Sequence, residues 1–174
     1  MSFSMSQASV PAFVIGLGVL SELLDKAEAF AAAKKIDPSV LLNWRLAPDM
    51  FALTRQVQIA TDQAKYGSAR LAGVEAPRYE DDETTVEQLK ARLAKTIAYI
   101  KTLDIEQIDA SAEREITFPR GRNSMGHMKG ADYLVYFVLP NFHFHVTTAY
   151  AILRRCGLEI GKRDFLGPIP IRMS

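Results

Sequence analysis

Apolar residues recur at helical spacing along four long segments of the chain. The segments cover about residues 9–33, 48–72, 84–100 and 132–155. The third is the most regular, and its apolar face carries Val86, Leu89, Leu93, Ile97 and Ile100. Four amphipathic helices with short links predict an all-α fold, an up-down four-helix bundle. The length of 174 residues suits one domain over residues 1–174, with one main core.

Capping residues set the expected helix ends. Ser9 is the expected N-cap of the first helix, with Pro11 in its first turn. Pro48 and Asp49 are expected to start the second helix. Thr84, with Glu87 three residues later, has the pattern of a capping box for the third. Gly157 is expected to end the last helix.

The helical pattern breaks before the last helix. Residues 115–118 alternate polar and apolar side chains, 119–123 are rich in turn residues, and 125–129 can return as a strand, which predicts a short β-hairpin. Within the last helix, Pro140 is expected to remove a hydrogen bond and cause a kink. A strand over 133–139 is the alternative, because Tyr, Val and Phe favour sheets. The tail 158–174 is expected to be irregular and to lie across the bundle.

The N-terminal apolar stretch, residues 10–24, resembles a signal peptide only superficially. No Lys or Arg precedes it, it contains Glu22, and its apolar residues gather on one helical face. We therefore expect a core helix and no membrane span. The net charge of +1 gives no indication of nucleic-acid or membrane binding. The single cysteine, Cys156, excludes an internal disulfide, and together these features suggest a soluble, cytoplasmic protein.

Two of the three histidines, His143 and His145, lie in the last predicted helix. On a helix they point about 200° apart and cannot bind one metal, whereas on a strand they could. The natural partner of His145 is then Asn141, one turn earlier, together with Gln56 from the second helix. Either these three side chains form a buried hydrogen-bond network, or they form a site. Thr148 is a weak candidate nucleophile, because threonines in helices more often donate to a carbonyl of their own helix.

Two segments carry a family resemblance. NWRLAPDM at 43–50 and LPNFHFHVTTAY at 139–150 resemble the signature segments of a bacterial domain-of-unknown-function family (DUF1993), which is grouped with the DinB/YfiT-like metalloenzymes. The resemblance implies a four-helix bundle, usually dimeric. Better-understood members of that superfamily hold a metal with one histidine from the second helix and two, four residues apart, from the last. Some use it in thiol transfer or hydrolysis.

Carried over residue by residue, the resemblance matches His145 to the last metal ligand. Asn141 and Gln56 then stand where the other two histidines are expected. The implied cofactor is a divalent metal such as zinc or nickel, or none. It would be held by His145 with Asn141 and Gln56, or with a carboxylate such as Asp49 or Asp62 that folding brings near. Without two of three histidines, a catalytic zinc would lose most of its coordination.

Three hypotheses for the function remain. The first is a bundle protein with a degenerate metal site that binds a small ligand and forms a homodimer. The second is a metal-dependent hydrolase or thiol or group transferase that uses His145 with weak co-ligands. The third uses His145 as a metal-free general base beside Asn141 and Tyr150. The sequence does not decide whether the protein is an enzyme, and it assigns no role to His127 or His143.

Overall fold

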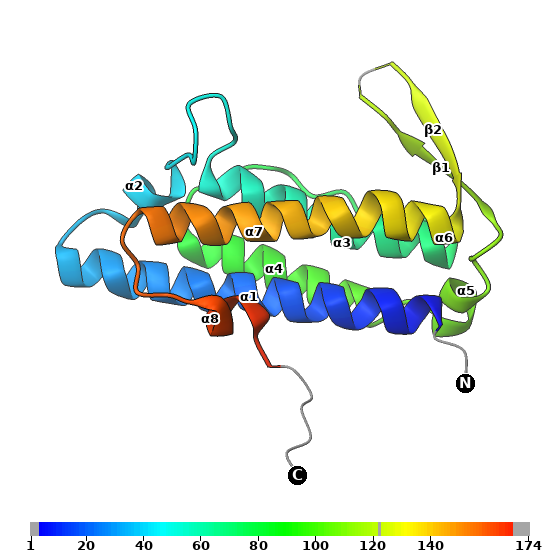
Figure 1. The fold of residues 1–174 in the computed structure, drawn as a ribbon, viewed down its shortest axis with the longest axis horizontal. Helices are drawn as coiled ribbons and strands as arrows, with labels where there is room; N and C mark the ends of the chain where they lie inside the picture. The colour runs from blue at the N-terminus through cyan, green and yellow to red at the C-terminus, as the bar shows by residue number, and fades with distance from the viewer. Residues whose placement is uncertain (1–3, 122, 169–174) are drawn as a thin grey trace, which may run out of the picture.

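Four long helices lie side by side in the computed structural model, which describes residues 4–121 and 123–168 (Figure 1). They are α1 (Met5–Lys34), α3 (Leu53–Ala72), α4 (Val86–Ile100) and α7 (Leu139–Arg155). The shorter elements are α2 (Pro38–Leu42), α5 (Ile105–Asp109), β1 (Glu115–Pro119), β2 (Met125–Lys129), α6 (Gly130–Asp132), the π-helix η1 (Tyr133–Val138) and α8 (Lys162–Leu166). The protein is therefore mostly helical with one small antiparallel sheet, as the sequence predicts.

The predicted up-down order is wrong, because α3 and α4 run in the same direction. Their contacts ascend along both helices: Arg92 of α4 donates to Thr61 of α3, and further along α4 Tyr99 donates to the carbonyl of Glu75, just beyond the end of α3. The connection, residues 73–85, returns along α3 before α4 begins. At about 3.3 Å per extended residue it spans roughly 40 Å, which exceeds the roughly 30 Å of α3. One long link thus replaces the short one expected.

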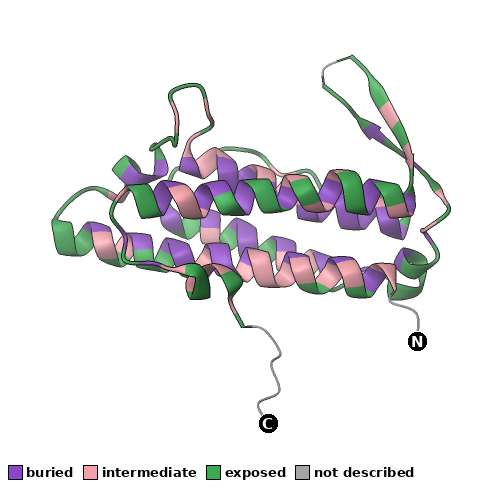
Figure 2. Ribbon diagram, viewed as in Figure 1, coloured by how far each residue is buried: buried purple, intermediate pink, exposed green. Residues whose placement is uncertain are grey.

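The four long helices bury one stripe each, and these stripes form the core (Figure 2). Phe13 of α1 packs edge-on against Phe142 of α7, with ring centroids 5.1 Å apart. A Cβ at Gly16 would lie 2.7 Å from the ring of Phe142, so the glycine lets these two helices approach closely. The expected core positions of the third helix, such as Leu89 and Leu93, are fully buried.

By length and apolar composition, α1 could cross a membrane. It is here the core helix that the sequence pattern predicts, since its buried residues pack in the hydrophobic core. Its start differs from the expectation: Ser4, with Gln7 three residues later, forms a capping box. Ser9 instead lies inside the helix and donates to the carbonyl of Met5. The apolar pattern did not reveal the extra turn.

The second long helix begins later than predicted, at Leu53. Pro48 and Asp49 lie in a loop over residues 43–52, which is closed by a 2.9 Å hydrogen bond from the Leu53 amide to the Trp44 carbonyl. At α4 the cap is Thr85 with Gln88, one residue beyond the predicted pair of Thr84 and Glu87. At α4 the difference arises because Thr84 and Thr85 offer the same capping chemistry, whereas Ala52 at the start of α3 makes no side-chain cap.

The helix after the hairpin widens into the π-helix η1 just before Pro140. The amide of Leu139 donates to the carbonyl of Leu134, five residues earlier instead of four. A proline has no amide hydrogen and its ring clashes with the carbonyl four residues before it in an α-helix. The wider turn accommodates Pro140, so a helix with a π segment is found where the sequence leaves a strand as the alternative.

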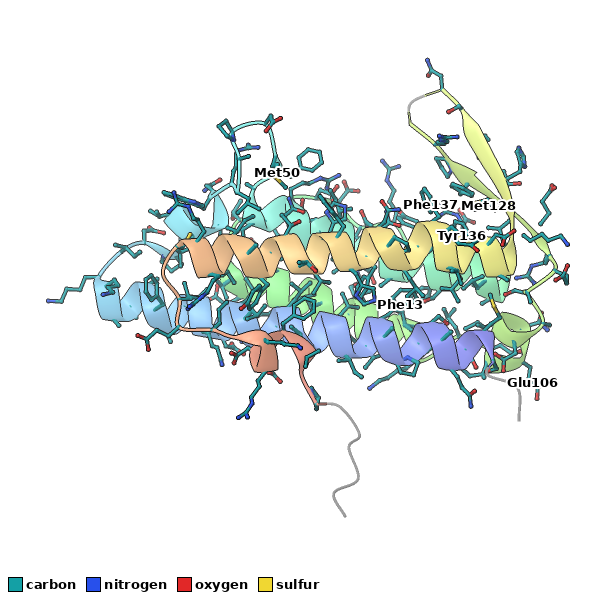
Figure 3. The ribbon with its side chains drawn as sticks, viewed as in Figure 1. Phe13, Met50, Glu106, Met128, Tyr136 and Phe137 are labelled. Atoms are coloured by element: carbon teal, nitrogen blue, oxygen red, sulfur yellow. The ribbon has the colours of Figure 1, made fainter. Side chains whose placement is uncertain are left out.

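The predicted hairpin is confirmed and rises from the helical body at one end (Figure 1). β1 pairs with β2 in antiparallel register, with Thr117 opposite His127. Phe118 packs the hairpin against the helices, since the centroid of its ring lies 4.5 Å from that of the Phe137 ring. Figure 3 shows Phe137 and Met128 where the hairpin meets the helices.

The C-terminal tail lies against α1, as expected, through α8. Lys26 of α1 forms an ion pair with Asp164 of α8. Gly157, at a φ of 98°, lies just beyond the end of α7 and fulfils its predicted role. Residues 169–174 of the predicted tail lie outside the described residues.

Candidate functional site

The sequence-predicted pair of His145 and Gln56 meets between α7 and α3. The Nδ1 atom of His145 lies 2.7 Å from the Oε1 atom of Gln56. The exposed fraction is 9% for His145 and 1% for Gln56, so this contact is largely shielded from water. The pairing of these two side chains is the part of the expected network that forms.

The hydrogen bonds of Gln56 fix the protonation of the imidazole. The Nε2 group of Gln56 donates to the carbonyl of Phe51 at 3.0 Å, so its Oε1 atom faces His145 and accepts. The Nδ1 atom of His145 must therefore carry the hydrogen, and the Nε2 atom holds a free lone pair. Within the described residues, that Nε2 atom has no hydrogen-bond partner.

The imidazole is neutral at physiological pH. Burial, and to a smaller extent the positive charge of Arg55, lower the pKa of His145 to about 4. His143, which is exposed and packs edge-on against Phe142, also has its pKa lowered by partial burial. The two histidines point in different directions, as the helical spacing predicts.

Asn141 does not join the pair. Its Nδ2 group donates to the carbonyl of Phe137, four residues earlier in its own helix, at 2.6 Å. Thr148 likewise donates to the carbonyl of Phe144 at 2.7 Å, which is the backbone contact expected in preference to a nucleophile. Tyr150 packs against Phe165 and takes no part in the His145 contact.

The contacts around His145 do not suit a catalytic metal. Zinc sites in enzymes use three ligands drawn from histidine, cysteine and carboxylate side chains. The described residues contain no group of three such side chains close enough to hold an ion. The Oε1 atom of Gln56 already accepts from His145, and the charge of Arg55 that disfavours a proton also disfavours a metal cation. Binding of a metal by His145, Asn141 and Gln56 is not tested by these contacts and stays a prediction.

The two carboxylates proposed as further ligands are placed elsewhere. Asp49 is exposed in the 43–52 loop. Asp62 is engaged by two buried cations, Arg92 at 3.0 Å and Lys65 at 3.1 Å. The ammonium of Lys65 also lies 3.8 Å from the centroid of the Tyr79 ring, which is a cation–π contact.

His127 and Cys156 take no part in the site. His127 is exposed on β2, where its Nδ1 atom lies 3.1 Å from the hydroxyl of Thr117. Partial burial raises the pKa of the Cys156 thiol, which leaves it protonated and unreactive.

Sequence reasoning missed a cleft of about 860 Å³ between α3 and the hairpin. Its walls come from α3, from η1 and from the turn of the hairpin: Arg55, Ile59, Asp62, Gln63, Tyr66, Arg70, Phe137, Pro119 and Gly121. The α3 residues share one helical face, so the spacing of Arg55, Ile59, Tyr66 and Arg70 was visible in the sequence. No local pattern in the sequence predicts that the hairpin lies over this face of α3 and completes the cleft.

Comparison with known proteins agrees with this architecture. Residues 5–166 match the family described as "Domain of unknown function (DUF1993)". A crystal structure of a DinB family member protein from Shewanella denitrificans is 43% identical, with a TM-score of 0.89, over 96% of this chain and 94% of that one. No curated protein matches the chain significantly. The family match covers nearly all of the described helices and includes both signature segments, and on that ground the chain belongs to the DUF1993 family.

Proposed function

We propose that this protein binds a small organic molecule beside His145, where α7 packs against α3, without a metal. The observation that supports the proposal is the 2.7 Å contact between the Nδ1 atom of His145 and Gln56. It fixes one tautomer and leaves the Nε2 atom as a hydrogen-bond acceptor. A ligand hydroxyl or N–H would donate to that atom.

The surroundings of His145 support a ligand with an aromatic or apolar body. Phe144 packs edge-on against the His145 ring, with centroids 5.2 Å apart. Trp44 and Phe51, in the loop that supplies the carbonyl bound by Gln56, are large and exposed apolar side chains. Exposed aromatic residues beside one polar group are typical of small-molecule sites.

The proposal includes the finer features that the sequence suggests. We take the fold as a DinB-like four-helix bundle with one long crossover, in a cytoplasmic homodimer. Between residues 5 and 21, α1 carries no charged side chain, which favours a partner on its outer face. The alternative function, a metal-dependent hydrolase or thiol or group transferase, is favoured only by the family resemblance.

Calorimetric titration of zinc and nickel into untagged protein separates these functions. The matched variants are His145→Asn, which keeps a donor near the position of Nδ1, and His127→Asn on the exposed hairpin. We expect no stoichiometric binding that depends on His145. A site of one metal per chain that is lost only in His145→Asn would replace the proposal with the metal-dependent alternative.

Ligand binding is tested with phenol, and with anisole as a control of similar shape that lacks the hydroxyl donor. Phenol should shift the NMR resonance of the His145 Cε1–H group and change Trp44 fluorescence in a saturable way. Anisole should bind at least several-fold more weakly, and the preference for phenol should vanish in His145→Asn. Equal responses to the two probes, or no response to either, would reject a hydrogen bond to the His145 Nε2 atom.

A further inference from the structure

The cleft between α3 and the hairpin has an apolar floor and charged ends. Ile59, Tyr66 and Phe137 supply the apolar surface, and Arg55 and Arg70 supply positive charge. Its volume of about 860 Å³ lies within the range of sites for small molecules, about 300–1,000 Å³. The cleft can therefore hold a molecule of metabolite size.

The charges in the cleft do not cancel. The acidic residue in its lining, Asp62, is already shared by the buried cations of Lys65 and Arg92. Arg55 forms an ion pair with Asp81. Arg70 forms no ion pair with any carboxylate in the part of the chain that the structure describes. The unbalanced charge in the cleft is thus the guanidinium of Arg70.

Arg70 is held in place by neutral groups. Its NH1 group donates to the hydroxyl of Tyr133 at 2.9 Å, and its guanidinium carbon lies 5.4 Å from the centroid of the Tyr66 ring. Tyr133 is 1% exposed and packs against Phe118 of the hairpin. An arginine that is oriented by a hydroxyl and a ring keeps most of its donors and all of its charge for another partner.

We infer that this cleft binds an amphipathic organic anion, with Arg70 on the acidic group and the apolar body over Ile59, Tyr66 and Phe137. The inference rests on the proposed small-molecule function and names the class of ligand. The cleft also includes Arg55, whose positive charge lowers the pKa of His145. Carboxylate and phosphate both match the forked donors of arginine.

The test uses 8-anilinonaphthalene-1-sulfonate, an aromatic anion whose fluorescence rises on binding. N-Phenyl-1-naphthylamine has the same rings without the sulfonate and serves as the neutral control. We expect Arg70→Gln to weaken binding of the sulfonate at least tenfold and to leave binding of the neutral amine unchanged. Arg70→Lys should give an intermediate loss, because it keeps the charge without the fork.

Two further variants define the role of Arg70. Arg155→Gln, at the exposed end of α7, should bind both probes as the wild type does. Tyr133→Phe removes the hydroxyl that orients Arg70 and should weaken the sulfonate severalfold. Thermal melts should show that each variant is folded. Competition by 1-naphthoate against 1-naphthyl phosphate then identifies the preferred acidic group.

Undetectable sulfonate binding to the wild type would overturn the inference. So would equal binding by Arg70→Gln, or a parallel loss of the sulfonate and the neutral amine, which indicates a general apolar surface. The phenol test at His145 gives a separate result. A failure there with an Arg70-dependent sulfonate site would refute only the role of His145.

Discussion

Lowering the pH should destabilise this protein through His145, and the size of the effect depends on its burial. The pKa of the imidazole is about 4 in the folded state and about 6.5 in an unfolded chain. Above pH 6.5 both states are neutral at this position. Between pH 6.5 and pH 4 the unfolded state binds the proton first, so the free energy of unfolding decreases as the pH falls.

Each pH unit in that window is equivalent to about 1.4 kcal/mol. At pH 5 the loss from His145 is therefore about 2 kcal/mol, and near pH 4 it approaches about 3 kcal/mol. A typical domain has a total stability of about 5–15 kcal/mol, so this is a substantial part of it. The contribution is constant again below pH 4, where both states are protonated.

Urea unfolding of the wild type and of His145→Asn, from pH 7.5 to pH 4.5, measures the effect. The carboxylates and His143 titrate in both proteins, so their contributions cancel in the difference. We expect the advantage of the wild type over the variant to shrink by about 2 kcal/mol between pH 7 and pH 5. An NMR titration of the Cε1–H resonance gives the folded pKa directly.

A difference in stability that stays constant over that pH range would refute the reasoning, because it would mean that His145 protonates as readily when folded as when unfolded. His127→Asn is the control. It replaces an imidazole that is exposed on the hairpin, away from the buried contact of His145.

Four further substitutions test other contacts by urea unfolding. Gln56→Leu should cost about 1–3 kcal/mol, because it leaves a buried N–H and a carbonyl unpaired; an unchanged midpoint would contradict the pairing. Lys65→Met should be neutral or stabilising, because the buried ammonium is expensive to desolvate and Asp62 keeps its ion pair with Arg92; a loss of several kcal/mol would show that the ion pair of Lys65 with Asp62 is a net gain. Gly130→Ala should cost about 3 kcal/mol, since the new Cβ would lie 2.0 Å from a backbone oxygen. Gly18→Ala, where a Cβ meets nothing within 4 Å, should stabilise α1 by about 0.5–1 kcal/mol, and equal effects at the two glycines would contradict this difference.

The long helices and the hairpin were predictable because their information is local. The spacing of Leu89 and Leu93 defines a buried stripe regardless of which element covers it. The relative direction of two helices does not depend on local spacing, so the parallel arrangement of α3 and α4 was not predicted. The π-helix was also missed. Over so few residues, the spacing of apolar side chains does not distinguish an α-helix, whose amides bond to the fourth residue back, from a π-helix, whose amides bond to the fifth.

The site was predictable only in part, for a related reason. His145 and Gln56 were paired correctly, since two buried polar side chains on facing stripes must satisfy each other. Asn141 was expected to join them but had a nearer acceptor in its own helix. The role of Arg70 depends on Tyr133, sixty-three positions away in sequence, and on a hairpin folded over α3. No spacing rule carries that information.

The π segment also bears on how relatives of this chain should be compared. In an unbroken α-helix, Tyr133 and His145, twelve residues apart, would point about 120° away from each other. A π-helical stretch acts as a one-residue insertion and rotates the C-terminal part of the helix by about 100°, so both side chains face α3. A relative with a one-residue gap in this stretch has these two positions eleven residues apart, which is about 20° in a regular α-helix, so both side chains still face α3 without a π segment. An alignment gap here would therefore mark loss of the inserted residue with the shared face retained, whereas a relative of full length without the π segment would turn one of the two side chains away from α3.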